Sequence, residues 1–101
     1  MSRTYSTFRE FYPFYLSEHR NRTCRRLHVV GSALGLVCLA AAIALHSFWF
    51  ILLGILVGYA CAWVGHFFFE KNRPATFHHP LYSFAGDWVM FRDILTGRMK
   101  L

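Results

Sequence analysis

Residues 27–69 read LHVVGSALGLVCLAAAIALHSFWFILLGILVGYACAWVGHFFF, and none of them carries a fixed charge. A transmembrane helix needs about 20 apolar residues, and this stretch is roughly twice that length. Because a bilayer offers no partner for unpaired backbone groups, two helices joined by a tight turn explain it best. The polar pair His46 and Ser47 lies near its middle. The sequence therefore predicts a helical hairpin with spans at 27–45 and 48–69.

The composition indicates a single membrane domain over residues 1–101. The chain is 55% hydrophobic and 19% aromatic, which is typical of membrane proteins. Its net charge of +6 comes from basic residues that bracket the two spans, rather than from a stripe beside exposed aromatic residues. The lipid bilayer is therefore an expected partner, and nucleic acid is not. The expected fold is an all-α integral membrane protein, and the positive-inside rule places both termini in the cytoplasm.

The segments that flank the hairpin are expected to be helical. In the amino-terminal arm, 1–22, the residues that share one side of a helix are Phe8, Tyr12, Tyr15 and His19. This spacing predicts an amphipathic helix at the membrane interface, and Pro13 predicts a kink or a late start. At the other end Pro80 favours the start of a last helix over 80–95, either interfacial or membrane-embedded.

Two aspartates on that last helix differ in their expected surroundings. Asp87 falls inside an apolar arc, whose members are Leu81, Phe84, Trp88, Phe91, Ile94 and Leu95. A carboxylate on a buried face needs a metal or a cationic partner. Asp93 lies on the opposite, polar side and is expected to be solvated.

His28 and His66 are expected to lie at the same depth, because they are equally far in sequence from a turn at Ser47. Small residues share one helix face with each histidine: Gly31, Ser32 and Gly35 follow His28 on the first span, and Ala62, Gly58 and Gly54 precede His66 on the second. Small residues at this spacing let membrane helices approach closely. The two histidines therefore face one another, and the same faces also allow a homo-oligomer.

A metal site is expected at this open end of the hairpin. The residues with suitable donor atoms are His19, His28, His66, Glu70 and Asp87, with His78 or His79 as further candidates. Imidazole and carboxylate ligands suit zinc, copper or iron. The cysteines Cys24, Cys38 and Cys61 form no metal-type pair and are expected to be apolar packing residues. His46, at the closed end, has no predicted role.

Two further features belong to this expected site. The helix must break between His19 and His28, which would otherwise lie on opposite sides, and Asn21 and Thr23 supply turn and capping chemistry for the break. The arginines that can pair with a carboxylate substrate at this end are Arg25, Arg26 and Arg73.

Two motifs resemble the signatures of a known family. His19-Arg20-Asn21 leading to His28 and Gly31, and the run GHFFFEKNRPA at 65–75, are similar to those of the Mpo1-like family. The resemblance implies an Fe(II)-dependent dioxygenase that shortens 2-hydroxy fatty acids by one carbon with O₂. It also implies that His19, His28 and His66 bind the metal, and that Asn21 and Glu70 are catalytic positions.

The tail of the chain refines this resemblance. Gly86 and Asp87 look like a motif of short bacterial-type members, which implies a bacterial inner membrane rather than the endoplasmic reticulum. The fungal representative differs, because it has additional spans between the two signatures.

A second interpretation from the residues alone is a non-catalytic membrane module that binds haem or a metal, or packs against a larger complex. Haem would need two histidines in axial geometry.

Overall fold

The computed structural model describes residues 5–74 and 77–101, and within these ranges the protein is all-helical, as predicted. Its elements are α1 (Phe8–Ser17), α2 (Arg22–Leu45), α3 (Trp49–Val64), the π-helix η1 (Gly65–Glu70) and α4 (Pro80–Leu95). The last helix spans the residues expected from the sequence. The first four residues of the predicted arm, and Ala75 of the second motif, lie outside the described residues.

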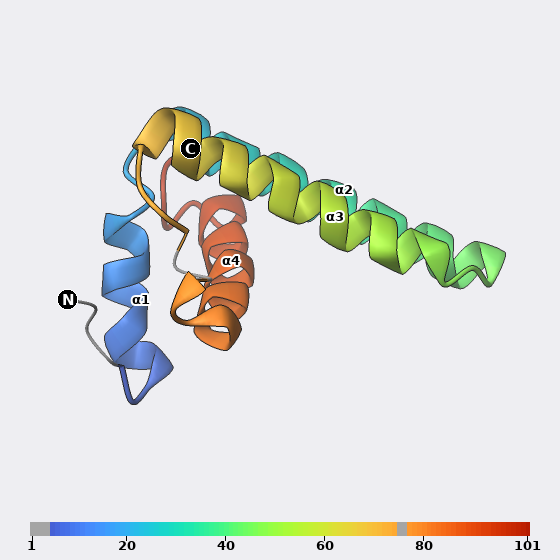
Figure 1. The fold of residues 1–101 in the computed structure, drawn as a ribbon, viewed down its shortest axis with the longest axis horizontal. Helices are drawn as coiled ribbons and strands as arrows, with labels where there is room; N and C mark the ends of the chain where they lie inside the picture. Colours follow the sequence, from blue (N-terminus) through green and yellow to red (C-terminus); the bar gives the residue numbers. More distant parts are fainter. Residues whose placement is uncertain (1–4, 75–76) are drawn as a thin grey trace.

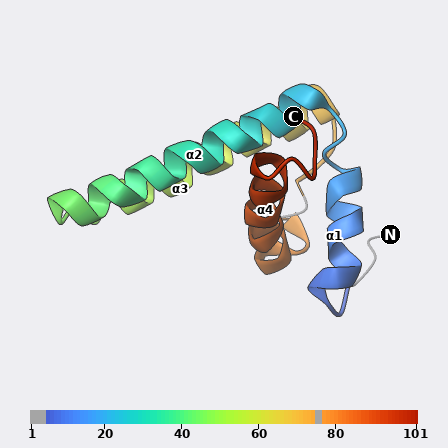
Figure 2. The ribbon, with the colours of Figure 1, turned by 180° about the vertical axis from the view of Figure 1, so that it is seen from behind.

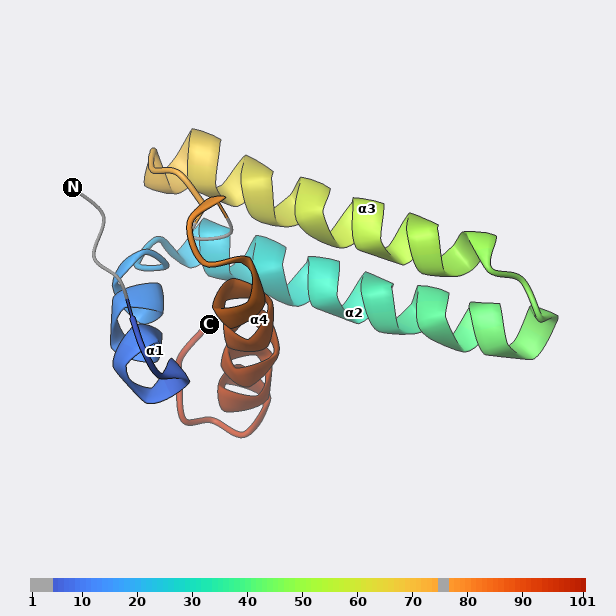
Figure 3. The same ribbon diagram turned by 60° about the horizontal axis from the view of Figure 1, so that its bottom comes forward.

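Helices α2 and α3 form an antiparallel hairpin that runs the length of the molecule (Figures 1 and 3). The turn falls at the predicted polar pair. His46 adopts a left-handed backbone conformation with φ of 50°, and the Ser47 N–H donates to the Ala42 carbonyl at 3.0 Å. This arrangement satisfies carbonyls at the end of α2 that would otherwise have no partner.

The first long helix begins earlier than the predicted span. It starts at Arg22 rather than Leu27, because the Asn21 side chain accepts the Cys24 N–H at 3.2 Å and caps the helix. The expected break between His19 and His28 is therefore present, and Asn21 makes it. The additional turn carries the basic residues that precede the apolar stretch.

The hairpin packs through the small residues that the sequence identified. A Cβ atom added to Gly31 would lie 3.0 Å from the Cys61 Cβ and 3.1 Å from the Gly58 carbonyl oxygen. One added to Gly54 would lie 3.0 Å from the Cys38 Cβ. At these distances the neighbouring atoms would have to move by a few tenths of an ångström to admit a side chain. Gly31 and Gly54 thus allow the close packing of α2 on α3 within the chain, and an oligomer through the same faces stays a prediction.

Helices α1 and α4 lie side by side across the open end of the hairpin, with α4 nearer to the hairpin tip (Figures 1 and 2). A core of buried side chains joins them: Tyr5, Phe11, Tyr15 and Met90. Helix α1 is capped by Thr7 and runs unbroken past Pro13, whose ring is on the exposed side. The late start that Pro13 predicted does not occur.

The orientation of α4 differs from the prediction. Its buried face carries Ser83, Gly86 and Met90, whereas the side chains of Leu81 and Phe84 in the predicted arc are 83% and 50% exposed. The cause is the close approach of α1. A Cβ at Gly86 would lie 2.9 Å from the Tyr15 ring, so only a face without a side chain can meet that ring. The predicted arc is therefore divided: Leu81, Phe84 and Leu95 are exposed, whereas Ile94 is partly buried against the core between α1 and α4.

Candidate metal centre

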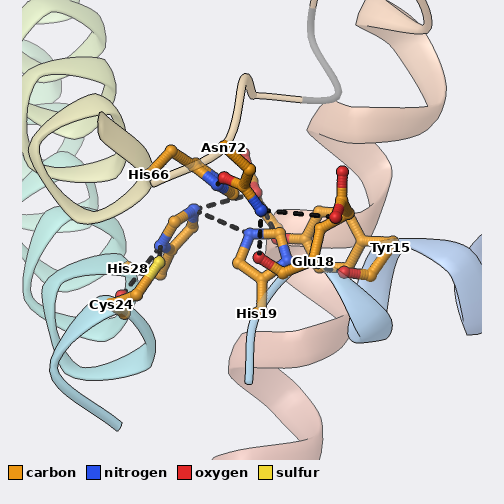
Figure 4. A network of polar contacts seen from close by, with 8 residues as sticks. Tyr15, Glu18, His19, Cys24, His28, His66 and Asn72 are labelled. Atoms are coloured by element: carbon orange, nitrogen blue, oxygen red, sulfur yellow. Dashed lines mark hydrogen bonds and ion pairs between the residues drawn. The ribbon is translucent and has the colours of Figure 1, made fainter. Parts of the chain in front are cut away.

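Three histidines from three segments meet at the open end of the hairpin. His19 follows α1, His28 lies on α2 and His66 lies on η1, and their rings face one another (Figure 4). The ring centroids are 4.5 Å apart for His19 with His28, 4.5 Å for His19 with His66 and 5.1 Å for His28 with His66. All three side chains are buried. The level, facing arrangement expected for His28 and His66 is present.

Backbone carbonyls fix the protonation of two of the rings. His19 Nδ1 lies 2.6 Å from the Tyr15 carbonyl oxygen, and His28 Nδ1 lies 2.9 Å from that of Cys24. Since a carbonyl oxygen can only accept a hydrogen bond, each Nδ1 must carry the proton and donate it. In a neutral imidazole the Nε2 atom of each ring is then an unprotonated acceptor.

Asn72 does the same for the third ring. Its Nδ2 donates to the Glu18 carbonyl at 3.2 Å and to the Glu18 carboxylate at 3.3 Å, so the amide oxygen must face His66. That oxygen accepts the His66 Nδ1–H at 2.8 Å. Asn72 stands in the second sequence motif, but a residue that acts through a ligand gives no spacing signal, and sequence reasoning did not assign it to the site.

The resulting donor set fits a metal ion. His19 Nε2 and His28 Nε2 are 3.1 Å apart, although neither carries a proton to share. Two nitrogens bound to one metal at about 2.1 Å, at angles of 90° to 110°, lie about 3.0 to 3.4 Å apart. In metal-binding histidines the ring nitrogen that does not bind the metal usually donates its N–H to a carbonyl or carboxylate, as each Nδ1 does here. Burial and the neighbouring His28 and His66 also lower the pKa of His19 to about 2, which keeps its imidazole neutral.

The π-helical turn places His66. Residues of η1 continue α3 with a wider turn, and such turns occur often at functional sites. A Cβ at Gly65 would lie 2.8 Å from the Cys24 Sγ and 3.2 Å from its Cα, so the backbone of η1 rests directly on α2. This contact brings His66 to the level of His28.

Cys24 belongs to the buried group, although the sequence suggested only a packing role. The ligand atoms of His19, Cys24, His28 and His66 all lie within 4.8 Å of one another, so that this group can hold a metal ion. The Cys24 Sγ lies 3.8 Å from His28 Nδ1, which is the nitrogen already bound to a carbonyl. In Figure 4 Cys24 lies on the side of His28 away from His19. The thiol is thus behind the ligand and not among the converging Nε2 atoms.

Asp87 is the carboxylate that the fold brings to the histidines. Its Oδ1 lies 3.9 Å from His28 Nε2 and accepts a hydrogen bond from the Tyr15 hydroxyl. Tyr15 in turn stacks on His19 with a centroid distance of 4.1 Å. Burial raises the pKa of Asp87 to about 6, although the Tyr15 hydrogen bond acts in the opposite direction.

Asp93 is not solvated, contrary to the sequence-based expectation. Its side chain is only 14% exposed, accepts the Tyr12 hydroxyl at 2.8 Å and pairs with Arg92 at 3.3 Å. Two tyrosines of α1 therefore bind two aspartates of α4. Only Asp87 lies beside the histidines.

The other expected site residues lie around the cluster or away from it. The Glu70 carboxylate accepts the Asn21 backbone N–H, which ties the end of η1 to the break before α2. His78 is exposed, and the His79 ring packs against the Tyr5 ring with a centroid distance of 5.3 Å. The structure therefore brings neither residue to the group of His19, His28 and His66.

The three arginines differ in position. Arg25 is partly buried and close enough to influence the pKa of His19. Its Nε is buried with no hydrogen-bond partner among the described residues. Arg26 and Arg73 are exposed.

These features define an all-helical protein with two helices apolar enough to cross a membrane and a buried histidine group that can hold a metal ion. Residues 5–99 match the family described as 2-hydroxy-palmitic acid dioxygenase Mpo1-like, and the chain belongs to this Mpo1-like family. No curated protein matches the chain. No solved structure matches it either.

Proposed function

We propose that this protein is a membrane-embedded Fe(II) dioxygenase that acts on 2-hydroxy fatty acids. The observation that carries the proposal is the meeting of three buried imidazoles, whose ring centroids are 4.5 to 5.1 Å apart. An acceptor holds the Nδ1–H of His19, His28 and His66 and so leaves each Nε2 unprotonated. The family description supports the reaction class. Three imidazoles that leave coordination positions open, with a carboxylate nearby, suit non-haem iron.

In this proposal the protein residues hold the iron and orient the acid. Bound Fe(II) supplies the activation of O₂ next to the 2-hydroxy acid head. Asp87 contributes negative charge 3.9 Å from His28 Nε2. Arg25 is the best placed of the three arginines to bind the substrate carboxylate. It lies on the same side of α2 as His28, three residues earlier, and its buried Nε has no hydrogen-bond partner among the described residues. The net change is C1–C2 cleavage: the acid and O₂ give an acid one carbon shorter, CO₂ and water.

Asn21 and Glu70 have contacts that support positioning rather than direct chemistry. Asn21 caps α2 and so sets the direction of the helix that carries His28. Glu70 holds the Asn21 N–H from the end of η1, close to His66. A direct catalytic role for either residue stays a prediction.

We infer that the hairpin spans the membrane. The apolar windows of α2 and α3 are only 17% and 22% buried within the chain, whereas the core helix of a soluble protein would be mostly buried. Helices α1 and α4 cross the hairpin at its open end (Figure 1), which supports a position along the membrane surface. The exposed members of the apolar arc, which are Leu81, Phe84 and Leu95, would then meet lipid.

Both termini are expected on the cytoplasmic side, because basic residues gather at the open end of the hairpin. A reporter fused at residue 1 and one fused at residue 101 should give the same cytoplasmic signal, and a fusion in the turn at His46 the opposite one. Reporters on opposite sides at the two termini would contradict the hairpin topology. A bacterial inner membrane is the proposed location.

The geometry does not favour haem. Ligation by two histidines needs imidazoles on opposite faces of a porphyrin, but His19 Nε2 and His28 Nε2 are 3.1 Å apart and leave no room for one between them. A metal-binding module without activity is the remaining alternative.

Activity in a bilayer tests the proposed function. Protein reconstituted in liposomes and loaded anaerobically with Fe(II) is expected to consume O₂ with 2-hydroxypalmitic acid and release the acid one carbon shorter. Palmitic acid without the 2-hydroxyl is the matched control, and it should give neither signal. Iron bound at the histidines without O₂ uptake would identify a non-catalytic module instead.

A further inference from the structure

An apolar groove follows the seam between α2 and α3 on the side that α4 covers. It has a volume of about 290 Å³, near the lower end of the roughly 300 to 1,000 Å³ of ligand pockets. Phe84 and Trp88 of α4 form part of its wall. The lining residues that decide its character are His28, Gly35, Leu39, Ile51, Gly58 and Asp87.

The two ends of the groove differ chemically. The end at the histidine cluster is formed by Asp87 and His28, which is 5% exposed. Among the described residues the neighbours of His28 Nε2 include the unprotonated His19 Nε2 and the Asp87 carboxylate. The other end is formed by Leu39 and Ile51 and is purely apolar. From His28 to Leu39 the helix rises about 16 Å, which is close to half of the roughly 30 Å hydrocarbon core of a bilayer. The groove therefore spans about the depth that the acyl chains of one leaflet occupy.

Two glycines along the groove are not explained by helix packing. A Cβ at Gly35 would meet only the Gly54 carbonyl oxygen, at 3.8 Å, and a Cβ at Gly58 only that of Gly31, at 3.7 Å. Both are ordinary contact distances, unlike the 3.0 Å found for Gly31 and Gly54. Alanine also has a higher helix propensity than glycine, so glycine is not favoured at these positions by the helix itself. At Gly35 and Gly58 the missing side chain thus leaves the groove open rather than bringing the helices together.

We propose that this groove holds the alkyl tail of the acid whose head lies at the histidine cluster, and that Gly35 and Gly58 determine how long a tail it admits. The proposal rests on the proposed function for the identity of the acid. The other polar side chains of the lining, Ser32 and Tyr59, also lie toward the histidine end. Ser32 is one turn from His28, and Tyr59 follows the Gly58 that packs on Gly31. This polarity orients the ligand, because a carboxylate or hydroxyl has no partner among Leu39 and Ile51. The tail runs toward the middle of the membrane.

Photolabelling tests the location of the tail without iron or turnover. A 2-hydroxypalmitic acid with a diazirine on its terminal carbon is expected to label residues 36–39 and 51–55, and one with the diazirine near the head to label residues 84–88. The matched control sites are Ile43 and Leu56, which are 68% and 67% exposed on the outside of the hairpin. Labelling confined to those sites would overturn the proposal. Equal labelling of the groove by a diazirine phospholipid would overturn it as well.

Substitutions in the groove test its role in chain length. Gly35→Leu or Gly58→Leu should weaken binding of 2-hydroxypalmitic acid about tenfold or more, because the tail would have to overlap the new side chain. Binding of 2-hydroxyoctanoic acid should change little. Leu39→Ala, at a side chain that is 45% exposed, should extend the range to longer acids. Ala33→Leu places the same leucine side chain on an exposed part of α2 outside the groove and should leave the chain-length profile unchanged.

The two proposals can fail separately. If the groove is labelled in the expected order but no O₂ is consumed, the tail site stands and the dioxygenase assignment does not. If turnover is found but Gly35→Leu, Gly58→Leu and Leu39→Ala all keep the wild-type profile of chain lengths, the groove is not the tail site.

Discussion

His28→Ala or His66→Ala is expected to abolish metal binding, with affinity lower by more than about 100-fold. Each variant removes one of three buried imidazoles that lie together, so that only two ring ligands remain, beside a void. Metal content per chain, measured after anaerobic Fe(II) loading and purification in detergent, should fall to background. His19→Ala should behave in the same way, because His19 Nε2 is 3.1 Å from His28 Nε2.

The controls for this prediction come from residues of the same chemistry. His46 caps α2 at the closed end of the hairpin, so His46→Ala should keep full metal content. Cys24→Ala should keep it too, because the thiol lies on the Nδ1 side of His28. Asn72→Leu should give an intermediate result, with affinity about 10 to 100-fold lower, because the His66 ring loses the partner that fixes its tautomer. Equal metal content in the His28, His66 and His46 variants would rule out the shared site.

Asp87→Asn is expected to reduce metal affinity or turnover by about 10 to 100-fold, the usual range for an outer-shell carboxylate, or by more if it binds the metal directly. The amide can still accept the Tyr15 hydroxyl, so the substitution removes the charge near His28 while keeping the link to α1. Metal content and turnover of 2-hydroxypalmitic acid should be compared at equal concentrations of folded protein.

Asp93→Asn is the matched control for that experiment. Asp93 is on the same helix, is similarly buried and also accepts a tyrosine hydroxyl, that of Tyr12. What it loses is an ion pair with Arg92, whose side chain is 60% exposed, and exposed pairs contribute about 0 to 1 kcal/mol. Metal binding should therefore be unchanged. If Asp93→Asn were the more damaging of the two, Asp87 would have to be withdrawn from the site.

The hairpin follows from local information in the sequence. A charge-free stretch about two spans long and a polar pair at its centre predict two helices and their turn. The two helices are antiparallel neighbours, so the equal distances of His28 and His66 from that turn predict that the rings are level. Small residues at helical spacing also predict the contact face, which Gly31 and Gly54 confirm.

The way in which α1 and α4 pack on the hairpin could not be obtained from periodicity. An apolar arc on a helix predicts a buried face only where the helix would otherwise meet water. On α4 the arc residues Leu81 and Leu95 stay exposed, while the Tyr15 ring lies against Gly86. The same packing of α1 on α4 also explains Asp93, which the helical pattern assigned to solvent. Its partner Tyr12 comes from a helix far away in the sequence.

The sequence by itself determined the helical class, the hairpin and the three histidines, because charge, hydropathy and motif spacing are properties of neighbouring residues. The tertiary structure alone decided which nitrogen of each ring is free, which carboxylate stands beside the cluster, and that Asn72 and Cys24 belong to its surroundings. It also distinguished glycines that pack helices from glycines that line a groove. Those features depend on distances of a few ångströms between segments far apart in the chain, and no sequence period encodes them.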